Sequence, residues 1–231
     1  GRKSFACSAG SVGGSPRRAV ARLSWLDLFR VAPPGLLTMG ITLYGGPQTR
    51  ASMPRWYMEE KGIPYDLVEV SVGASQNLQP DFLVVNPFGK LPAMRDDSVL
   101  DGNNQPLTLF ESGAILLHLA EHHGGEGTTA AERSQISQWT HFANSTLAFA
   151  IFVPDQKQKV LPRLLKQLDQ QLNRGFLVGE AWGAADCAVT AYLAYIKLFF
   201  PQEDLSAYPA VQALIEATQQ RAAYKKVMGM S

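Results

Sequence analysis

The sequence predicts a mixed α/β domain at about residues 40–124, followed by an all-α domain at about residues 129–228. The pattern of apolar residues supports both domains. Short apolar runs alternate with helical patterns as far as Gly124-Gly125, which indicates the α/β domain. Beyond Gly124-Gly125 the apolar residues recur only at helical spacing, which indicates the all-α domain. A third observation is that residues 1–39 differ in composition from the rest of the chain. With 231 residues, 46% of them apolar, the chain can bury a substantial core.

Residues 1–39 are predicted to be a leader rather than part of the fold. They hold six basic residues against the single acid Asp27, a net charge of +5, whereas the whole chain carries +1. They are rich in Ser, Gly, Ala and Arg, as is typical of an organellar transit peptide. A disordered tail or a translated upstream leader before Met39 is the alternative.

The α/β domain is predicted to begin with a strand at residues 41–45 and a helix at residues 50–62. Gly62 can end that helix, and Ile63-Pro64-Tyr65 leads into a second strand. The turn between the first strand and the helix carries Thr49, Arg50 and Ser52.

The segment Asn86-Pro-Phe-Gly-Lys-Leu-Pro92 is the next distinctive feature. Pro92 opens a short apolar strand, has no amide hydrogen and stands where a cis peptide bond is tolerated. The backbone carbonyl and amide of Leu91 would then be free for an extended ligand.

A further strand, residues 107–110, gives way at Glu111-Ser112 to a helix with apolar residues at helical spacing. The free amides of a helix N-terminus bind carboxylates well. Taken alone, Glu111-Ser112 could instead be a simple helix cap. Together with the Leu91-Pro92 segment, it indicates a site for a small extended peptide.

The all-α domain is predicted from three helical patterns. Thr129-x-x-Glu132 has the form of a capping box, and an amphipathic run of leucines follows at residues 161–172. Residues 184–199 are apolar nearly all round, which indicates a helix buried at the centre of a bundle. Asp186 near its start needs partners, and Gly183 at the cap position offers no side chain.

The motifs Asn-Pro-x-Gly-Lys-Leu-Pro at 86–92 and Glu-Ser-x-Ala-Ile at 111–115 resemble the glutathione-binding half of the soluble glutathione transferases. Further matches at 41–45, 50–65, 176–179 and Ala185-Asp186 extend the resemblance from Thr42 to Met228. The loop ending in Thr49-Arg-Ala-Ser52 looks most like the cyanobacterial chi class, with Thr49 in place of that class's first serine. The resemblance implies a thioredoxin-like N-terminal domain, a helical C-terminal domain and a homodimer.

The resemblance also implies how glutathione is held. Glu111 would pair with its ammonium, and Ser112 would hold the γ-glutamyl carboxylate. Leu91, placed by Pro92, would bind the cysteinyl backbone, and Lys90 would meet the glycyl carboxylate. Glutathione would be a co-substrate, and no cofactor is implied.

Catalysis would need the glutathione thiolate, which a hydroxyl or a cation near the sulfur can stabilise. Thr49, Arg50 and Ser52 lie where the thiol should point, with Thr49 as first choice, and Tyr44, inside the strand, is a weaker candidate. The implied reaction is attack on a small hydrophobic electrophile or reduction of a hydroperoxide. A noncatalytic carrier of hydrophobic ligands and a protein-interaction module are the alternatives.

Other partners are not indicated. A net charge of +1 argues against a nucleic-acid surface, and no uncharged apolar run reaches 18 residues, so no membrane span is expected. The four histidines show no metal-ligand spacing, so no metal is implied. Cys7 lies in the leader, and Cys187 is predicted to be a buried, unreactive core residue.

The resemblance of the folded part to a cyanobacterial class makes a plastid the expected destination. A mitochondrion and the cytosol are the alternatives.

Overall fold

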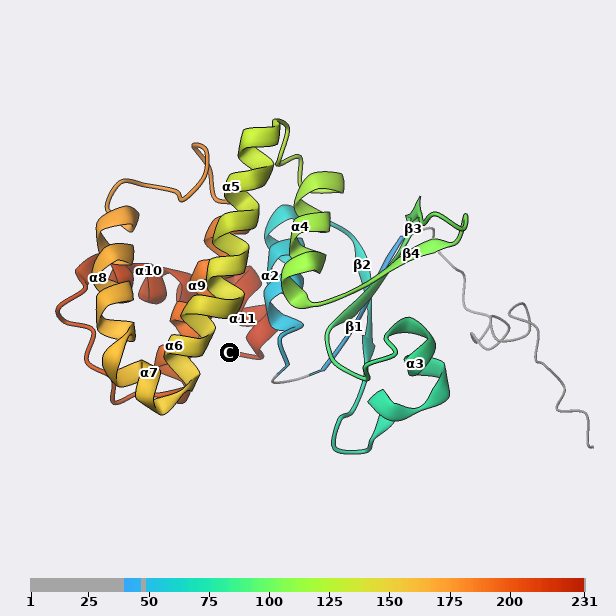
Figure 1. The fold of residues 1–231 in the computed structure, drawn as a ribbon, viewed down its shortest axis with the longest axis horizontal. Coiled ribbons are helices and arrows are strands. Elements are labelled where there is room, and N and C mark those ends of the chain that lie inside the picture. Colours follow the sequence, from blue (N-terminus) through green and yellow to red (C-terminus); the bar gives the residue numbers. More distant parts are fainter. Residues whose placement is uncertain (1–39, 47–48, 231) are drawn as a thin grey trace, which may run out of the picture. The chain divides into compact units, whose positions relative to one another are not determined.

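The structure is a computed structural model that describes residues 40–46 and 49–230, so the predicted leader lies outside the described residues. A four-stranded mixed sheet forms the first part (Figure 1). Its strand order is β2 (Tyr65–Glu69), β1 (Ile41–Gly45), β3 (Ala93–Leu100), β4 (Pro106–Phe110). β1 is parallel to β2 and antiparallel to β3, and β3 is antiparallel to β4.

Helices cover both faces of this sheet (Figure 1). α2 (Ser52–Lys61) and α4 (Ser112–His122) pack on one face, and α3 (Pro80–Val85), preceded by η1 (Gln76–Leu78), packs on the other. The alternation of β1 explains the division, because Ile41 and Leu43 point into the main core while Tyr44 points toward Phe82 of α3. This arrangement confirms the predicted thioredoxin-like domain.

The second part is all helical, as predicted. Its elements are α5 (Ala130–His141), η2 (Phe142–Leu147), α6 (Ala148–Phe152), α7 (Pro154–Lys159), α8 (Leu161–Leu172), α9 (Ala184–Phe199), α10 (Pro209–Gln220) and α11 (Ala222–Met228). The Thr129 hydroxyl accepts from the Glu132 amide and caps α5. η2 is a π-helical turn that joins α5 to α6. None of the described helices is long and apolar enough to cross a membrane.

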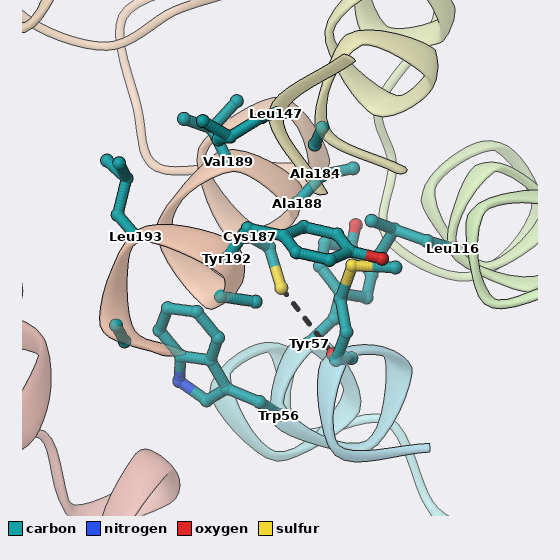
Figure 2. Packing of buried hydrophobic residues seen from close by; sticks show 14 of the residues in the cluster. Trp56, Tyr57, Leu116, Leu147, Ala184, Cys187, Ala188, Val189, Tyr192 and Leu193 are labelled. Carbon is teal, nitrogen blue, oxygen red and sulfur yellow. Dashed lines mark hydrogen bonds between the residues drawn. The ribbon is translucent and has the colours of Figure 1, made fainter. Parts of the chain in front are cut away.

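α9 lies at the centre of the core, and Cys187, the fourth residue of this helix, packs inside the cluster (Figure 2). Trp56 and Tyr57 of α2 and Leu116 of α4 reach this cluster, so one apolar core joins the helical part to the α/β part. Cys187 is fully buried, and its thiol donates to the Met53 carbonyl at 3.5 Å. The prediction of a buried core cysteine is confirmed.

The N-terminus of α9 is capped by a residue that the sequence did not point to. Asp186 accepts from the amides of Gly183 and Leu177, at 3.1 and 3.0 Å. The Ala184 amide, however, donates to the Glu126 carboxylate at 2.9 Å. Glu126 comes from the segment between α4 and α5, and a Cβ on Gly183 would lie only 2.5 Å from its Oε2. The missing cap side chain is therefore replaced by a distant carboxylate that needs glycine at position 183.

Candidate active site

The sheet register brings the predicted binding segments together. Ala93 of β3 pairs with Tyr44 of β1 on one side and with Phe110 of β4 on the other. The last residues of β1 and β4 therefore lie beside the first residue of β3, at one edge of the sheet. The loop that follows β1, the Leu91-Pro92 segment and Glu111 all start from this edge.

The loop before β3 is held by buried amides. Asn86 is fully buried and donates to the Lys90 carbonyl at 2.8 Å, and Asn77 donates to the Gly89 carbonyl at 2.8 Å. The Leu91–Pro92 peptide bond is cis. The backbone of Leu91 is thus fixed by its neighbours, while the Lys90 side chain is exposed to solvent. The sequence pattern alone does not indicate the part that the two asparagines play.

Glu111 has an unusual backbone at the start of α4. Its φ is 72°, in a region that a residue with a side chain occupies only at a cost. Its side chain is exposed and makes no cap hydrogen bond to α4. Ser112 is buried, and its hydroxyl accepts a long hydrogen bond, 3.5 Å, from the Asn144 amide. The geometry does not support the simple-cap interpretation of Glu111, and α4 begins with no side-chain cap on its amides.

Thr49 uses its hydroxyl within its own loop. The hydroxyl donates to the Gly46 carbonyl at 2.9 Å and accepts from the Ala51 amide at 3.3 Å. Tyr44 packs edge to face on Phe82, with ring centroids 6.0 Å apart, on the face of the sheet away from α2. Tyr44 therefore points to the α3 side of the sheet, where Leu91 packs against the same small core cluster.

Ser52, the first residue of α2, meets the helical part directly. Its hydroxyl oxygen is 2.6 Å from the Tyr195 hydroxyl oxygen of α9. Arg50 is exposed, and its guanidinium carbon is 5.8 Å from the centroid of the Tyr192 ring. Neither tyrosine was predicted as a site residue, although their spacing of three on one helix places them on the same face.

Both tyrosine hydroxyls keep their protons at neutral pH, and the buried Tyr192 hydroxyl has no hydrogen-bond partner among the described residues. Burial raises the pKa of Tyr192 to about 12, against the opposing effect of Arg50. Burial also raises the pKa of Tyr195, and the hydrogen bond with Ser52 opposes that shift. Since an unperturbed phenol already titrates near pH ~10, both hydroxyls keep their protons.

A cavity of about 870 Å³ opens beside these groups. Thr49, Arg50 and Ser52 form a polar part of its wall, and Tyr195 of α9 joins them. Its apolar lining residues include Leu67, Phe152, Leu198, Phe199, Val227 and Met228. A second cavity, of about 730 Å³, is lined by Asn144 of η2 and shares Arg50 and Phe152 with the first. Lys90, Leu91, Pro92, Glu111 and Ser112 line neither cavity.

The histidines were predicted to have no metal-ligand spacing, yet two of them meet an acid in space. His118 and His123 both contact Asp96 of β3. Asp96 lies 22 residues before His118, and a strand, a turn and half of a helix separate them. No local spacing could have indicated this cluster.

A thioredoxin-like domain with a cis-proline segment, a free helix N-terminus and an all-helical partner domain defines the class of glutathione transferases. Residues 39–121 match the family described as Glutathione S-transferase, N-terminal domain, and residues 144–227 match Glutathione S-transferase, C-terminal domain. The chain belongs to the glutathione S-transferase family.

Proteins named as disulfide-bond oxidoreductases and as glutathione transferases are similar to this chain. The chain is 33% identical to the disulfide-bond oxidoreductase YfcG of Escherichia coli, over 79% of this chain and 92% of YfcG. It is 30% identical to glutathione S-transferase 3 of Zea mays, over 74% and 85% of the two chains. A crystal structure of a Burkholderia graminis glutathione transferase, with two glutathione molecules bound per subunit, is similar with a TM-score of 0.69 and 27% identity, covering 84% and 90%.

Proposed function

We propose that this protein is a glutathione transferase that joins the glutathione thiolate to small hydrophobic electrophiles and that also reduces hydroperoxides. The observation that carries this proposal is the position of Thr49, Arg50 and Ser52. They line a cavity together with apolar side chains and with Arg55, Glu69 and Lys226. Thr49 and Arg50 lie in the loop that starts from the same sheet edge as the Leu91-Pro92 and Glu111-Ser112 segments, and Ser52 begins α2.

Glutathione would lie along this edge in an extended conformation. The Leu91 backbone would bind its cysteinyl residue, and the exposed Lys90 ammonium would meet the glycyl carboxylate. The uncapped N-terminus of α4 with Ser112 would take the γ-glutamyl carboxylate, and the exposed Glu111 carboxylate would pair with the ammonium. The thiol would then point toward the loop between β1 and α2.

Activation of the thiol needs a donor near sulfur. A free cysteine thiol has a pKa of about 8.5, so each unit of lowering corresponds to about 1.4 kcal/mol of thiolate stabilisation. Thr49, Ser52 and Arg50 are the proposed stabilisers. Because the Thr49 hydroxyl already donates to Gly46, and Ser52 pairs with a neutral Tyr195 hydroxyl, the Ser52–Tyr195 pair is a strong competitor for the role.

Turnover with glutathione and a panel of haloarenes, isothiocyanates and hydroperoxides tests the proposal. Thioether formation or hydroperoxide reduction well above the uncatalysed rate is expected. A protein that binds glutathione and hydrophobic ligands but turns over none of these substrates would instead be a carrier, and one that binds neither would be an interaction module.

Disulfide reduction is a second candidate, favoured by the likeness to YfcG and to a structure with two bound glutathiones. One glutathione thiolate would attack a disulfide and release a thiolate, and a second glutathione would attack the mixed disulfide to give glutathione disulfide and the other thiol. Glutathione supplies both electrons, which suits a site whose nearest described cysteine, Cys187, is buried. Reduction of 2-hydroxyethyl disulfide, coupled to glutathione reductase, tests it.

The subclass, the assembly and the destination are also proposals. The loop ending in Thr49-Arg-Ala-Ser52 supports a chi-like subclass, and the family likeness supports a homodimer, which light scattering on the purified chain would test. The composition of residues 1–39 supports import into a plastid. These residues fused to a fluorescent reporter should direct it there, and a diffuse cytosolic signal would contradict that destination.

A further inference from the structure

A buried carboxylate lies under the C-terminal end of α4, outside the proposed active site. Asp96 has no exposed surface. Its Oδ1 accepts from the amide and the hydroxyl of Ser98, at 2.9 and 2.6 Å, which fixes the plane of the carboxylate. Its Oδ2 lies 2.8 Å from Nε2 of His118 and 2.6 Å from Nε2 of His123. One carboxylate oxygen and two imidazole nitrogens thus lie within 4.8 Å of one another.

Asp96 has no permanently charged partner among the described residues. Buried charges in proteins are normally paired with an opposite charge or bound to a metal. The partners of Asp96 among the described residues are Ser98, His118 and His123, and none of them carries a permanent charge. The nearest basic residue in sequence, Arg95, pairs with Asp97 instead.

We propose that Asp96, His118 and His123 form a binding site for a divalent transition-metal ion of the Zn²⁺ type. Imidazole nitrogen and carboxylate oxygen are ligands that zinc prefers, and three protein ligands with a water in the fourth position is a common arrangement. Each histidine binds as a neutral ring with its proton on Nδ1. The Ser98 hydrogen bonds hold the carboxylate in the way that outer groups orient metal ligands.

The location favours a cation for a second reason. His123 follows the last residue of α4, where the helix dipole places partial negative charge. Metal–ligand distances of about 2.0–2.2 Å in a tetrahedral site separate the ligands by about 3.4 Å, so His118 and His123 must withdraw slightly from Asp96. The His123 side chain is 21% exposed at the helix end, so it can move and can admit the ion and its water.

His122 provides a matched control. It neighbours His123 in sequence, its side chain is exposed, and its ring contacts that of His118 at a centroid distance of 4.5 Å, but it does not belong to the ligand cluster. If the ion bound instead at the surface through His122, His122→Gln would weaken binding and His123→Gln would not.

The experiment titrates the full chain, after treatment with a chelator, with Zn²⁺ by calorimetry and with Co²⁺ by visible absorption. We expect one ion per chain, a Co²⁺ d–d spectrum of nitrogen–oxygen coordination, and a rise in the thermal midpoint with Zn²⁺. His123→Gln should weaken binding at least tenfold, Ser98→Ala should weaken it about tenfold, and His122→Gln should leave it unchanged. Circular dichroism would confirm that each variant is folded.

The proposal is overturned if the wild-type chain binds neither ion. It is also overturned if His122→Gln abolishes binding while His123→Gln and Ser98→Ala do not. In either case the Asp96 cluster is a hydrogen-bonded structural element, with each histidine donating from Nε2. Because the readouts are metal binding and spectroscopy, they are independent of the transferase proposal.

Discussion

Replacing Glu126 by alanine should destabilise the fold far more than its place in a connecting segment suggests. The Oε1 of Glu126 accepts from the buried Tyr57 hydroxyl at 2.8 Å, and its Oε2 accepts from the buried Ala184 amide at 2.9 Å. The residue thus ties α2 and α9 to the segment between α4 and α5. The third partner, Lys61, forms a partly exposed ion pair with Oε1.

The expected loss follows from these contacts. A buried donor left without a partner costs about 1–3 kcal/mol, so two of them give roughly 2–6 kcal/mol. Because the Glu126 side chain is 15% exposed, water can reach part of the space it leaves, and we expect about 3 kcal/mol, toward the lower end. Lys61→Ala removes the partly exposed ion pair and a contact of the ammonium with the Tyr57 ring at 5.7 Å, and it leaves no buried donor unpaired, so it should cost less than about 1 kcal/mol.

Equilibrium urea unfolding followed by circular dichroism measures both losses. Gly183→Ser adds a second test, since its Cβ would meet Oε2 of Glu126 at 2.5 Å in the wild-type chain. It should destabilise the wild-type chain but restore about 1 kcal/mol to the Glu126→Ala variant by supplying a helix cap. A loss below about 0.5 kcal/mol for Glu126→Ala, or an identical effect of Gly183→Ser in both backgrounds, would refute the reasoning.

Three further predictions concern the active site and the core. Glu111→Ala should remove a charge-assisted contact of about 1.5–3 kcal/mol and so raise the glutathione dissociation constant tenfold or more. Calorimetry measures this constant, and unchanged affinity would contradict the proposed pairing of Glu111 with the glutathione ammonium. If Thr49 stabilises the thiolate, Thr49→Val should lower turnover and shift the pH profile of turnover upward, while Thr49→Ser stays active. If Ser52→Ala and Tyr195→Phe shift the pH profile instead, the Ser52–Tyr195 pair stabilises the thiolate. Burial raises the pKa of the Cys187 thiol well above its usual range, so iodoacetamide should label it only after unfolding. Peptide mass spectrometry separates Cys187 from Cys7, and labelling of Cys187 in the native chain would contradict its burial.

The α/β fold and the positions of its candidate binding segments could be predicted because their signals are local. A strand ending in Gly45, a proline at position 92 and a helix beginning at Ser112 each follow from a few adjacent residues, and the structure places all three at one sheet edge. The long apolar stretch that became α9 was equally plain from its own composition.

The groups that the sequence did not reveal act across long separations. Glu126 caps a helix 58 residues away, and Tyr195 meets Ser52 across 143 residues. The residues next to Glu126, which lies between two glycines, and next to Tyr195, which lies in an apolar helix, do not indicate whether either side chain has a partner. Their partners are set by how α9 packs on α2, which no local pattern of polar residues encodes.

The most direct test of the central claim is the rate at which the full chain forms a thioether from glutathione and a haloarene, with the conjugate identified by mass spectrometry. The account predicts a rate that exceeds the uncatalysed reaction, saturates with glutathione, and needs a higher glutathione concentration to saturate in the Glu111→Ala variant. A rate equal to the uncatalysed reaction for haloarenes, isothiocyanates and hydroperoxides alike, from a folded chain that binds glutathione, would contradict it.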